Sequence, residues 1–175
     1  MADFLTDVRA LRDKARENLM SGPVTPAYGT DVHKVVDMLN TALATEIICV
    51  LRYRQHHFTA KGLNSEPVAA EFLEHSNEEQ VHADELAARI VQLGGTPVMD
   101  PRDAAGRAHT QYIAADGLTE MIKENLIAER IAIATYTEMI NWIGASDPTT
   151  RRVLEGILAN EEEHADDMLT FLQNP

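Results

Sequence analysis

Two matching residue patterns constrain the fold of this 175-residue chain more than any other feature. Each pattern contains a glutamate, a tyrosine seven residues later, and an ExxH motif 32 or 33 residues after the glutamate. Equivalent positions in the two patterns are 82 or 83 residues apart, so the spacing within each pattern is nearly the same. The first pattern consists of Glu46, Tyr53, Glu79 and His82, and the second of Glu129, Tyr136, Glu161 and His164.

Helical geometry explains why this spacing matters. Residues seven apart on an α-helix lie only about 20° apart around its axis, and residues three apart are neighbours on its surface. Each glutamate–tyrosine pair therefore shares one helix face, and each ExxH motif directs both of its side chains toward one centre. The spacing predicts four helices that supply these side chains to a common interior.

The apolar residues predict the same four helices. Apolar spacings that alternate between three and four indicate long helices at about 31–61, 65–93, 116–144 and 148–172. The four glutamates lie within these apolar seams and not on the polar faces. The predicted fold is all-α, a four-helix bundle with a short N-terminal helix and a long crossover between helices two and three. The crossover, residues 94–115, includes a predicted short helix at 103–109 and lets helices two and three run in the same direction.

The first 30 residues are predicted to be a separate N-terminal segment, and residues 31–175 the bundle domain. Residues 3–20 can form an amphipathic helix, and residues 21–30 form a linker with two prolines and two glycines. The positive and negative side chains of residues 3–20 nearly balance. This balance favours a packed or interface helix over a basic tail that binds DNA.

Four glutamates on core seams require a source of positive charge. They carry a charge of −4, and an uncompensated buried carboxylate costs several kcal/mol or more. Two divalent cations would cancel this charge, and carboxylates with neutral imidazoles suit iron or manganese and, less specifically, zinc. We expect one ion at each terminal glutamate and bridging by the glutamates of the ExxH motifs. The predicted terminal ligands are Glu46 and Glu129, the bridging ligands are Glu79 and Glu161, and the histidine ligands are His82 and His164.

Other polar residues receive weaker predictions. Tyr53 and Tyr136 are candidates to supply an electron or a hydrogen bond to the centre, although Tyr136 fits a core tyrosine with a satisfied hydroxyl equally well. Three residues near Glu79 could guide iron, but we expect them to be solvated: Glu74, His75 and Glu78. No partner is predicted for His33, His56, His57 and His109.

Composition excludes several classes of protein. The formal net charge of −13 opposes binding to a nucleic-acid backbone and attracts cations. The single cysteine, Cys49, excludes an internal disulfide or a Cys-rich metal site, and we expect it to be a buried thiol. The N-terminal residues lack the apolar region of a signal peptide, and no apolar run is long enough to span a membrane. We therefore expect a cytoplasmic location.

With these residues identified, the chain resembles the ferritin-like superfamily over residues 31–173, and especially bacterioferritins and bacterioferritin-like mini-ferritins. The matching segments are TEIICVLRYRQHH, EEQVHADELAARIVQLGGTP, IAERIAIATYTE and LANEEEHADDML. In that family these segments carry the ferroxidase centre, and its arrangement of glutamates and ExxH motifs is well known. The resemblance implies two iron ions per subunit at the six residues named above, with Tyr53 matching the family's tyrosine near the centre.

Two departures refine this expectation. Gln80 follows the first ExxH glutamate, where bacterioferritins carry a haem-binding methionine, so no haem is expected. The fifth helix that helps close the 24-subunit bacterioferritin shell is not predicted. The resemblance therefore favours a 12-subunit homo-oligomer like the mini-ferritins related to starvation-induced DNA-protection proteins. Those proteins place iron between subunits, whereas the ligands predicted here lie within one bundle.

The predicted function is that of a ferroxidase for iron storage and detoxification. Two Fe²⁺ ions would bind, O₂ or H₂O₂ would take their electrons, and ferric iron would pass to a mineral in a protein cavity. A di-manganese catalase or a rubrerythrin-like peroxidase uses the same ligand set and is the alternative, although the Cys₄ domain common in rubrerythrins is absent. A metal-stabilised scaffold or a DNA-coating shell is a third hypothesis, and the acidic charge argues against DNA as a partner.

Overall fold

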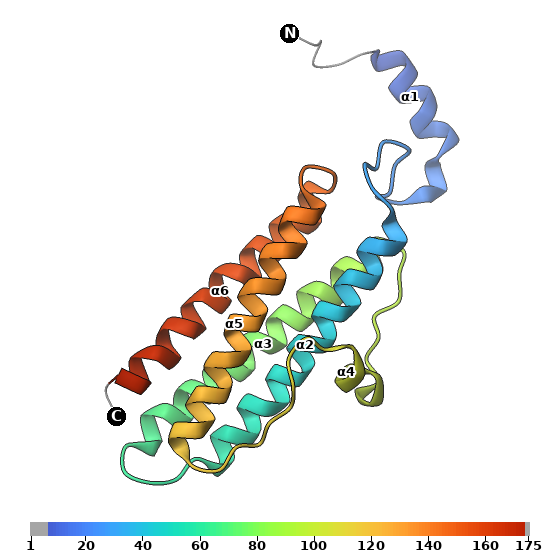
Figure 1. Cartoon of the computed structure of the whole chain (residues 1–175). Helices are drawn as coiled ribbons and strands as arrows, with labels where there is room; N and C mark the ends of the chain where they lie inside the picture. The colour runs from blue at the N-terminus through green and yellow to red at the C-terminus, as the bar shows by residue number, and fades with distance from the viewer. Residues whose placement is uncertain (1–6, 174–175) are drawn as a thin grey trace.

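The computed structural model describes residues 7–173 and shows only helices in that range (Figure 1). Among these residues, no helix combines the length and the apolar character that crossing a membrane requires. One short 3₁₀ helix covers Leu19–Ser21. The α-helices are α1 (Val8–Glu17), α2 (Val32–Thr59), α3 (Ser65–Gln92), α4 (Pro101–Arg107), α5 (Leu118–Ile143) and α6 (Pro148–Gln173).

The four long helices form a bundle of two hairpins. Helices α2 and α3 make one antiparallel pair, and α5 and α6 make the other (Figure 1). The crossover between α3 and α5 returns along the bundle and places α4 against α2, so α3 and α5 run in the same direction. The predicted fold class, including the long crossover, is confirmed.

The helix ends follow local signals in the sequence. Asp31 caps α2 by accepting a hydrogen bond from the His33 amide at 3.0 Å. Asp100 accepts from the Arg102 amide at 3.0 Å, so α4 begins at Pro101 and ends at 107, two residues earlier than the predicted 103–109. The third long helix begins at Leu118 and not at Asp116, because Gly117 occupies the cap position.

The core consists of two apolar layers with a polar centre between them. One layer joins α2, α3, α5 and α6 near the crossover's start, and the other fills the opposite end around Tyr53 and Phe72. The apolar seams of α3 and α5 are almost entirely buried, and in α2 Val35 and Cys49 are buried more fully than their neighbours Val36 and Val50. The face of α2 that is covered is wider than one seam, because α4 adds a contact through Ala104.

The N-terminal segment differs most from the prediction. Residues 3–6 of the predicted helix lie outside the described residues, and α1 ends at Glu17. Helix α1 projects away from the bundle (Figure 1), with Val8 and Leu11 about half exposed and no buried residue. Helix α1 therefore does not pack into its own bundle, and the prediction of a packed or interface helix is left to a contact with another subunit, which stays a prediction.

Candidate metal centre

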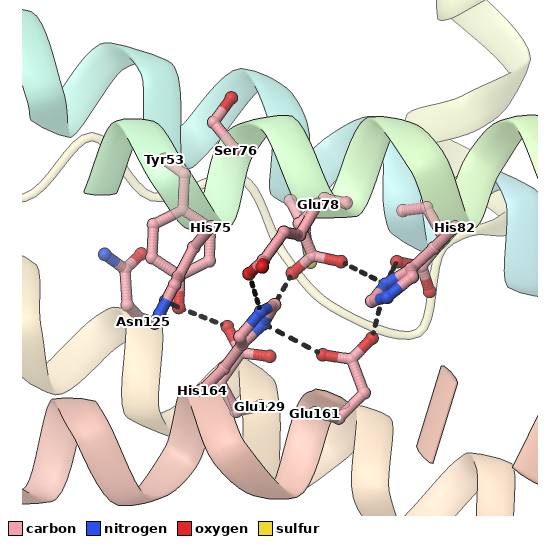
Figure 2. Close-up of polar contacts among 12 residues, drawn as sticks. Tyr53, His75, Ser76, Glu78, His82, Asn125, Glu129, Glu161 and His164 are labelled. Atoms are coloured by element: carbon pink, nitrogen blue, oxygen red, sulfur yellow. Dashed lines mark hydrogen bonds and ion pairs between the residues drawn. The ribbon is translucent and has the colours of Figure 1, made fainter. Parts of the chain in front are cut away.

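The six residues predicted to bind metal lie together inside the bundle. Figure 2 labels His82, Glu129, Glu161 and His164 among them. Each long helix contributes: α2 and α5 supply one glutamate each, and α3 and α6 supply one ExxH motif each. Every one of the six residues is at most 4% exposed. A set of four carboxylates and two imidazoles this deeply buried has very little access to water as a compensating partner.

The ligand-type atoms form two overlapping sets, each within 4.8 Å. Two glutamates belong to both sets, which is the arrangement expected of bridging carboxylates. Each remaining glutamate shares its set with one histidine. The first set is Glu46, Glu79, His82 and Glu161, and the second is Glu79, Glu129, Glu161 and His164.

Distances within the first set are those of atoms around one ion. Bonds of about 2.1 Å from an ion place neighbouring ligand atoms about 3.0–3.4 Å apart in octahedral or tetrahedral geometry. The Nδ1 atom of His82 lies 3.2 Å from a Glu79 oxygen, 3.3 Å from a Glu161 oxygen and 3.5 Å from a Glu46 oxygen. In the second set, Nδ1 of His164 lies 3.6 Å from Glu161 and 3.7 Å from Glu79.

Unpartnered polar atoms test whether these residues fit metal ions. Seven fully buried side-chain nitrogen or oxygen atoms in the described residues have no hydrogen-bond partner. Six of them belong to the predicted ligands, and the seventh is Nδ2 of Asn125. Buried polar groups are normally hydrogen-bonded, so such a concentration requires a different kind of partner. The unpartnered ligand atoms are Glu46 Oε2, Glu79 Oε1, Glu129 Oε2, Glu161 Oε1 and Oε2, and His164 Nδ1.

The pKa values of these groups reflect the same crowding of negative charge. Burial, together with the negative charge of Glu79, raises the pKa of Glu46 to about 8. Burial and the neighbouring carboxylates of Glu79 and Glu161 raise the pKa of Glu129 well above its usual range. Burial alone would lower the pKa of His164, but the nearby carboxylates of Glu161 and Glu79 raise it to about 11. The cluster therefore attracts protons strongly, as it would attract any cation.

Two tyrosines bind the terminal glutamates across the bundle. The hydroxyl of Tyr53, on α2, donates to Oε1 of Glu129 on α5 at 2.5 Å. The hydroxyl of Tyr136, on α5, donates to Oε1 of Glu46 on α2. Each glutamate thus has one oxygen held by a tyrosine, and its other oxygen is the unpartnered one. The sequence predicted both tyrosines near the centre, but not that each holds the glutamate of the other helix.

The structure contradicts part of the prediction that the residues near the first ExxH motif are solvated. Glu74 is exposed, as expected, but His75 is 1% exposed and stacks on His164 with 3.9 Å between ring centroids. The prediction that His75 is solvated is therefore wrong. The sequence held a signal for its burial, because His75 lies one turn from both Phe72 and Glu79 on the buried face of α3. Burial and the positive charge of His164 lower the pKa of His75 to about 3.

Glu78 and His164 form a contact that the sequence did not indicate. An oxygen of Glu78 lies 2.8 Å from Nε2 of His164, so the imidazole donates to it while Nδ1 faces the centre (Figure 2). A carboxylate behind a histidine ligand is a common way to fix its ring orientation. Because Glu78 is on α3 and His164 on α6, neither helix pattern alone predicts the pair.

A buried arginine network lies next to the centre. Arg52 is 1% exposed and donates to Asn125 Oδ1 and to Thr110 Oγ1, both at 3.0 Å. His56, for which no partner was predicted, lies 3.1 Å from the same Asn125 oxygen and 3.1 Å from the carbonyl oxygen of Ile113. This network fastens the crossover to α2 and to the turn of α5 that precedes Glu129.

A surface pocket of about 290 Å³ reaches the centre at His82. It opens between α3 and α6 and has two carboxylates at its wall. Gly156 leaves this wall open, since a Cβ there would meet nothing within 4 Å. The lining residues are Glu78, Val81, His82, Glu85, Gly156, Ile157 and Asn160.

Fold and site together define a ferritin-like helix bundle with a buried carboxylate–histidine cluster. The Ferritin-like domain family matches residues 36–175, and the chain belongs to this family. Its relatives include the DNA protection during starvation protein of Pyrococcus furiosus, 32% identical over 139 residues that cover 78% of this chain and 75% of the relative. The bacterioferritin of Rhodobacter capsulatus is 28% identical over 134 residues, covering 76% and 79% of the two chains.

Solved structures agree with this membership. The bacterioferritin-related protein of Bacteroides fragilis, described as a dodecameric thioferritin, has a TM-score of 0.81 and 34% identity, covering 83% of this chain and 88% of that chain. A ferritin-like di-iron-carboxylate protein of Bacillus anthracis has a TM-score of 0.71 and 25% identity, covering 81% and 96%. The expected resemblance to bacterioferritins and mini-ferritins is confirmed.

Proposed function

We propose that this protein is a ferroxidase that oxidises Fe²⁺ at a pair of iron sites inside each bundle and stores the ferric product. The observation that carries the proposal is the group of six unpartnered buried atoms on the predicted ligands. Four carboxylates offer a charge of −4, and two Fe²⁺ ions supply +4. Glu46 with His82, and Glu129 with His164, would each hold one ion, and Glu79 and Glu161 would bridge them.

The proposed reaction balances with either oxidant. Two Fe²⁺ ions lose one electron each, and O₂ takes both electrons with two protons to give H₂O₂. When H₂O₂ is the oxidant, the same two electrons and two protons yield two water molecules. The chain's part is to hold both ions within reach of one oxidant molecule. Tyr53 and Tyr136 keep the terminal carboxylates in place, and the apolar layers on either side limit access of water.

Storage and assembly are supported by the relatives. The Bacteroides fragilis protein is described as a dodecamer, and we propose a 12-subunit homo-oligomer here as well. The formal net charge of −13 gives such a shell a field that draws Fe²⁺ toward it. Some relatives are named for DNA protection or DNA binding, but the net charge of −13 leads us to expect no DNA binding here.

The test is an Fe²⁺ titration followed by native mass spectrometry and stopped-flow absorbance. We expect two Fe²⁺ per chain under anaerobic conditions, and rapid formation of ferric iron when O₂ or H₂O₂ is added. Glu161→Ala should abolish rapid oxidation, whereas Glu162→Ala, an exposed neighbour on the same helix, should leave it intact. Oxidation that survives Glu161→Ala would contradict the proposal. Release of O₂ from H₂O₂ without uptake of iron would instead favour the catalase alternative, with manganese as the metal.

A further inference from the structure

A second cluster of ligand-type side chains lies beside the centre and shares none of its six residues. It consists of Glu71 and His75 on α3 and Asp167 on α6, whose ligand-type atoms lie within 4.8 Å of one another. Nε2 of His75 is 3.3 Å from Oε1 of Glu71 and 3.4 Å from Oδ2 of Asp167. These separations match the roughly 3.0–3.4 Å expected between neighbouring ligand atoms around one ion with bonds of about 2.1 Å.

The hydrogen bond of the Nδ1 atom of His75 determines whether its Nε2 atom carries a hydrogen or a lone pair. Tyr53 donates its only hydroxyl hydrogen to Glu129, as described above. The Tyr53 oxygen, 3.3 Å from Nδ1 of His75, is then left to accept a hydrogen bond from that nitrogen. In this tautomer Nδ1 carries the hydrogen, and Nε2 presents a lone pair to the two carboxylates.

One imidazole nitrogen and two carboxylate oxygens therefore converge at separations that suit one ion. The His75 side chain is held in place facing the two carboxylates, since the residue is only 1% exposed. A cation among the three atoms would bond to all three. One imidazole with two carboxylates is a ligand set that suits a divalent transition metal.

We infer that Glu71, His75 and Asp167 form a third binding site for a divalent transition-metal ion, next to the pair of sites in the centre. The Glu71 and Asp167 side chains are 29% and 41% exposed, so an ion reaches this site directly from solution. With fewer and more exposed ligands than the centre, it binds its ion more weakly. The inference does not depend on the proposed oxidation of iron, because it concerns binding alone.

The test uses Co²⁺ as a probe that requires no oxidant. Equilibrium dialysis of the full-length protein should show two tightly bound Co²⁺ ions per chain and a weaker third. Glu71→Gln combined with Asp167→Asn should remove the third ion and leave the tight pair. The matched control is Glu74→Gln with Asp166→Asn, which changes the same charge on exposed positions of the same two helices and should retain all three.

A Co²⁺ anomalous-diffraction peak at bonding distance from Nε2 of His75 is the second expected result. The inference is overturned if that peak is absent at saturating Co²⁺, or if the double variant keeps it. A protein that shows the peak but lacks the tight pair would refute the proposed centre and leave the third site standing.

Discussion

At the scale of single residues, the two buried tyrosines explain how four acidic side chains keep their places. Tyr53 and Tyr136 each hold one oxygen of a terminal glutamate, which leaves the other oxygen free for an ion. The glutamate–tyrosine spacing of seven residues is what allows this, because it puts both groups on one face of each helix. The repeated pattern in the sequence therefore encodes the support of the site as well as its ligands.

Replacing either tyrosine with phenylalanine should weaken metal binding. Loss of a hydrogen bond behind a metal ligand typically costs about 10–100-fold in affinity. We expect Tyr53→Phe to weaken mainly the ion at Glu129, and Tyr136→Phe the ion at Glu46, each by about 10-fold in a Co²⁺ calorimetric titration. Tyr112→Phe changes a tyrosine that is 46% exposed and serves as the control. Equal affinities for all four proteins would show that the tyrosines only fill space.

The residues that sequence reasoning missed share one property. The six predicted ligands were found because their spacing repeats, and repetition is visible along the chain. Contacts between different helices do not produce a repeated spacing in the sequence. The pairing of Glu78 with His164 and the hydrogen bonds of His56 are therefore visible only in the folded structure. His75 is the exception, since its position on the buried face of α3 was available from the sequence.

At the scale of elements, a buried ion pair joins the N-terminal linker to two helix ends. Arg89, near the end of α3, donates two hydrogen bonds of 2.9 Å to the carboxylate of Asp147. Asp147 also accepts from the Thr150 amide at 2.9 Å, which caps α6, and from the Tyr28 hydroxyl at 2.6 Å. The linker, the end of α3 and the start of α6 are thus fixed by the side chain of Asp147.

Asp147→Asn should destabilise the fold by about 3 kcal/mol, because it leaves a buried arginine without its negative partner. Burial alone would raise the pKa of Asp147, but hydrogen bonds from Thr150, Tyr28 and Arg89 lower it to about 2. The pKa of an aspartate in the unfolded chain is about 3.9, so the Asp147 carboxylate stabilises the fold above that pH.

This stabilisation is lost as the pH falls toward 2, so the difference between wild type and variant should shrink over that range. Urea unfolding at several pH values measures it, with the exposed Asp103→Asn as the control. A difference in unfolding free energy that stays constant from pH 6 to pH 2.5 would contradict this account of Asp147.

The α3 terminus depends on a glycine for a different reason. A Cβ on Gly95 would lie 2.6 and 2.9 Å from the two methyl carbons of Val36. Gly95→Ala should therefore overpack the junction of α3 and α2 and cost about 1–3 kcal/mol in the free energy of unfolding. Gly106→Ala, in α4, meets nothing within 4 Å and should be neutral or slightly stabilising. Thermal unfolding of the two variants compares them directly, and equal melting temperatures would refute this explanation.

Boundaries and placement of elements were less predictable than their existence. The apolar seams located the four long helices well, because the spacing that specifies a helix acts within a few residues. Helix α4 begins two residues before its predicted start, because Asp100 caps it and Pro101 fits its first turn. The position of α1 depends on what its apolar face contacts, and nothing along residues 8–17 specifies that contact.

At the scale of the whole molecule, stability and metal content should be linked. Two cations would cancel the electrostatic repulsion among the four buried glutamates, so metal binding should stabilise the folded state. A site saturated at 100 times its dissociation constant adds about 2.7 kcal/mol. We expect Co²⁺ to raise the melting temperature of the wild type by several degrees, and by clearly less in Glu161→Ala. The exposed-site variant Glu162→Ala should respond like wild type, and a melting temperature independent of Co²⁺ in all three would be evidence against metal binding.

The most direct test of the central claim is anomalous diffraction from crystals of the wild-type protein soaked anaerobically with Fe²⁺. We predict two iron peaks inside every bundle, one bonded to Glu46 and His82 and the other to Glu129 and His164, with Glu79 and Glu161 contacting both. A bundle interior without iron at saturating Fe²⁺, or with iron bound only at the protein surface, would contradict the account.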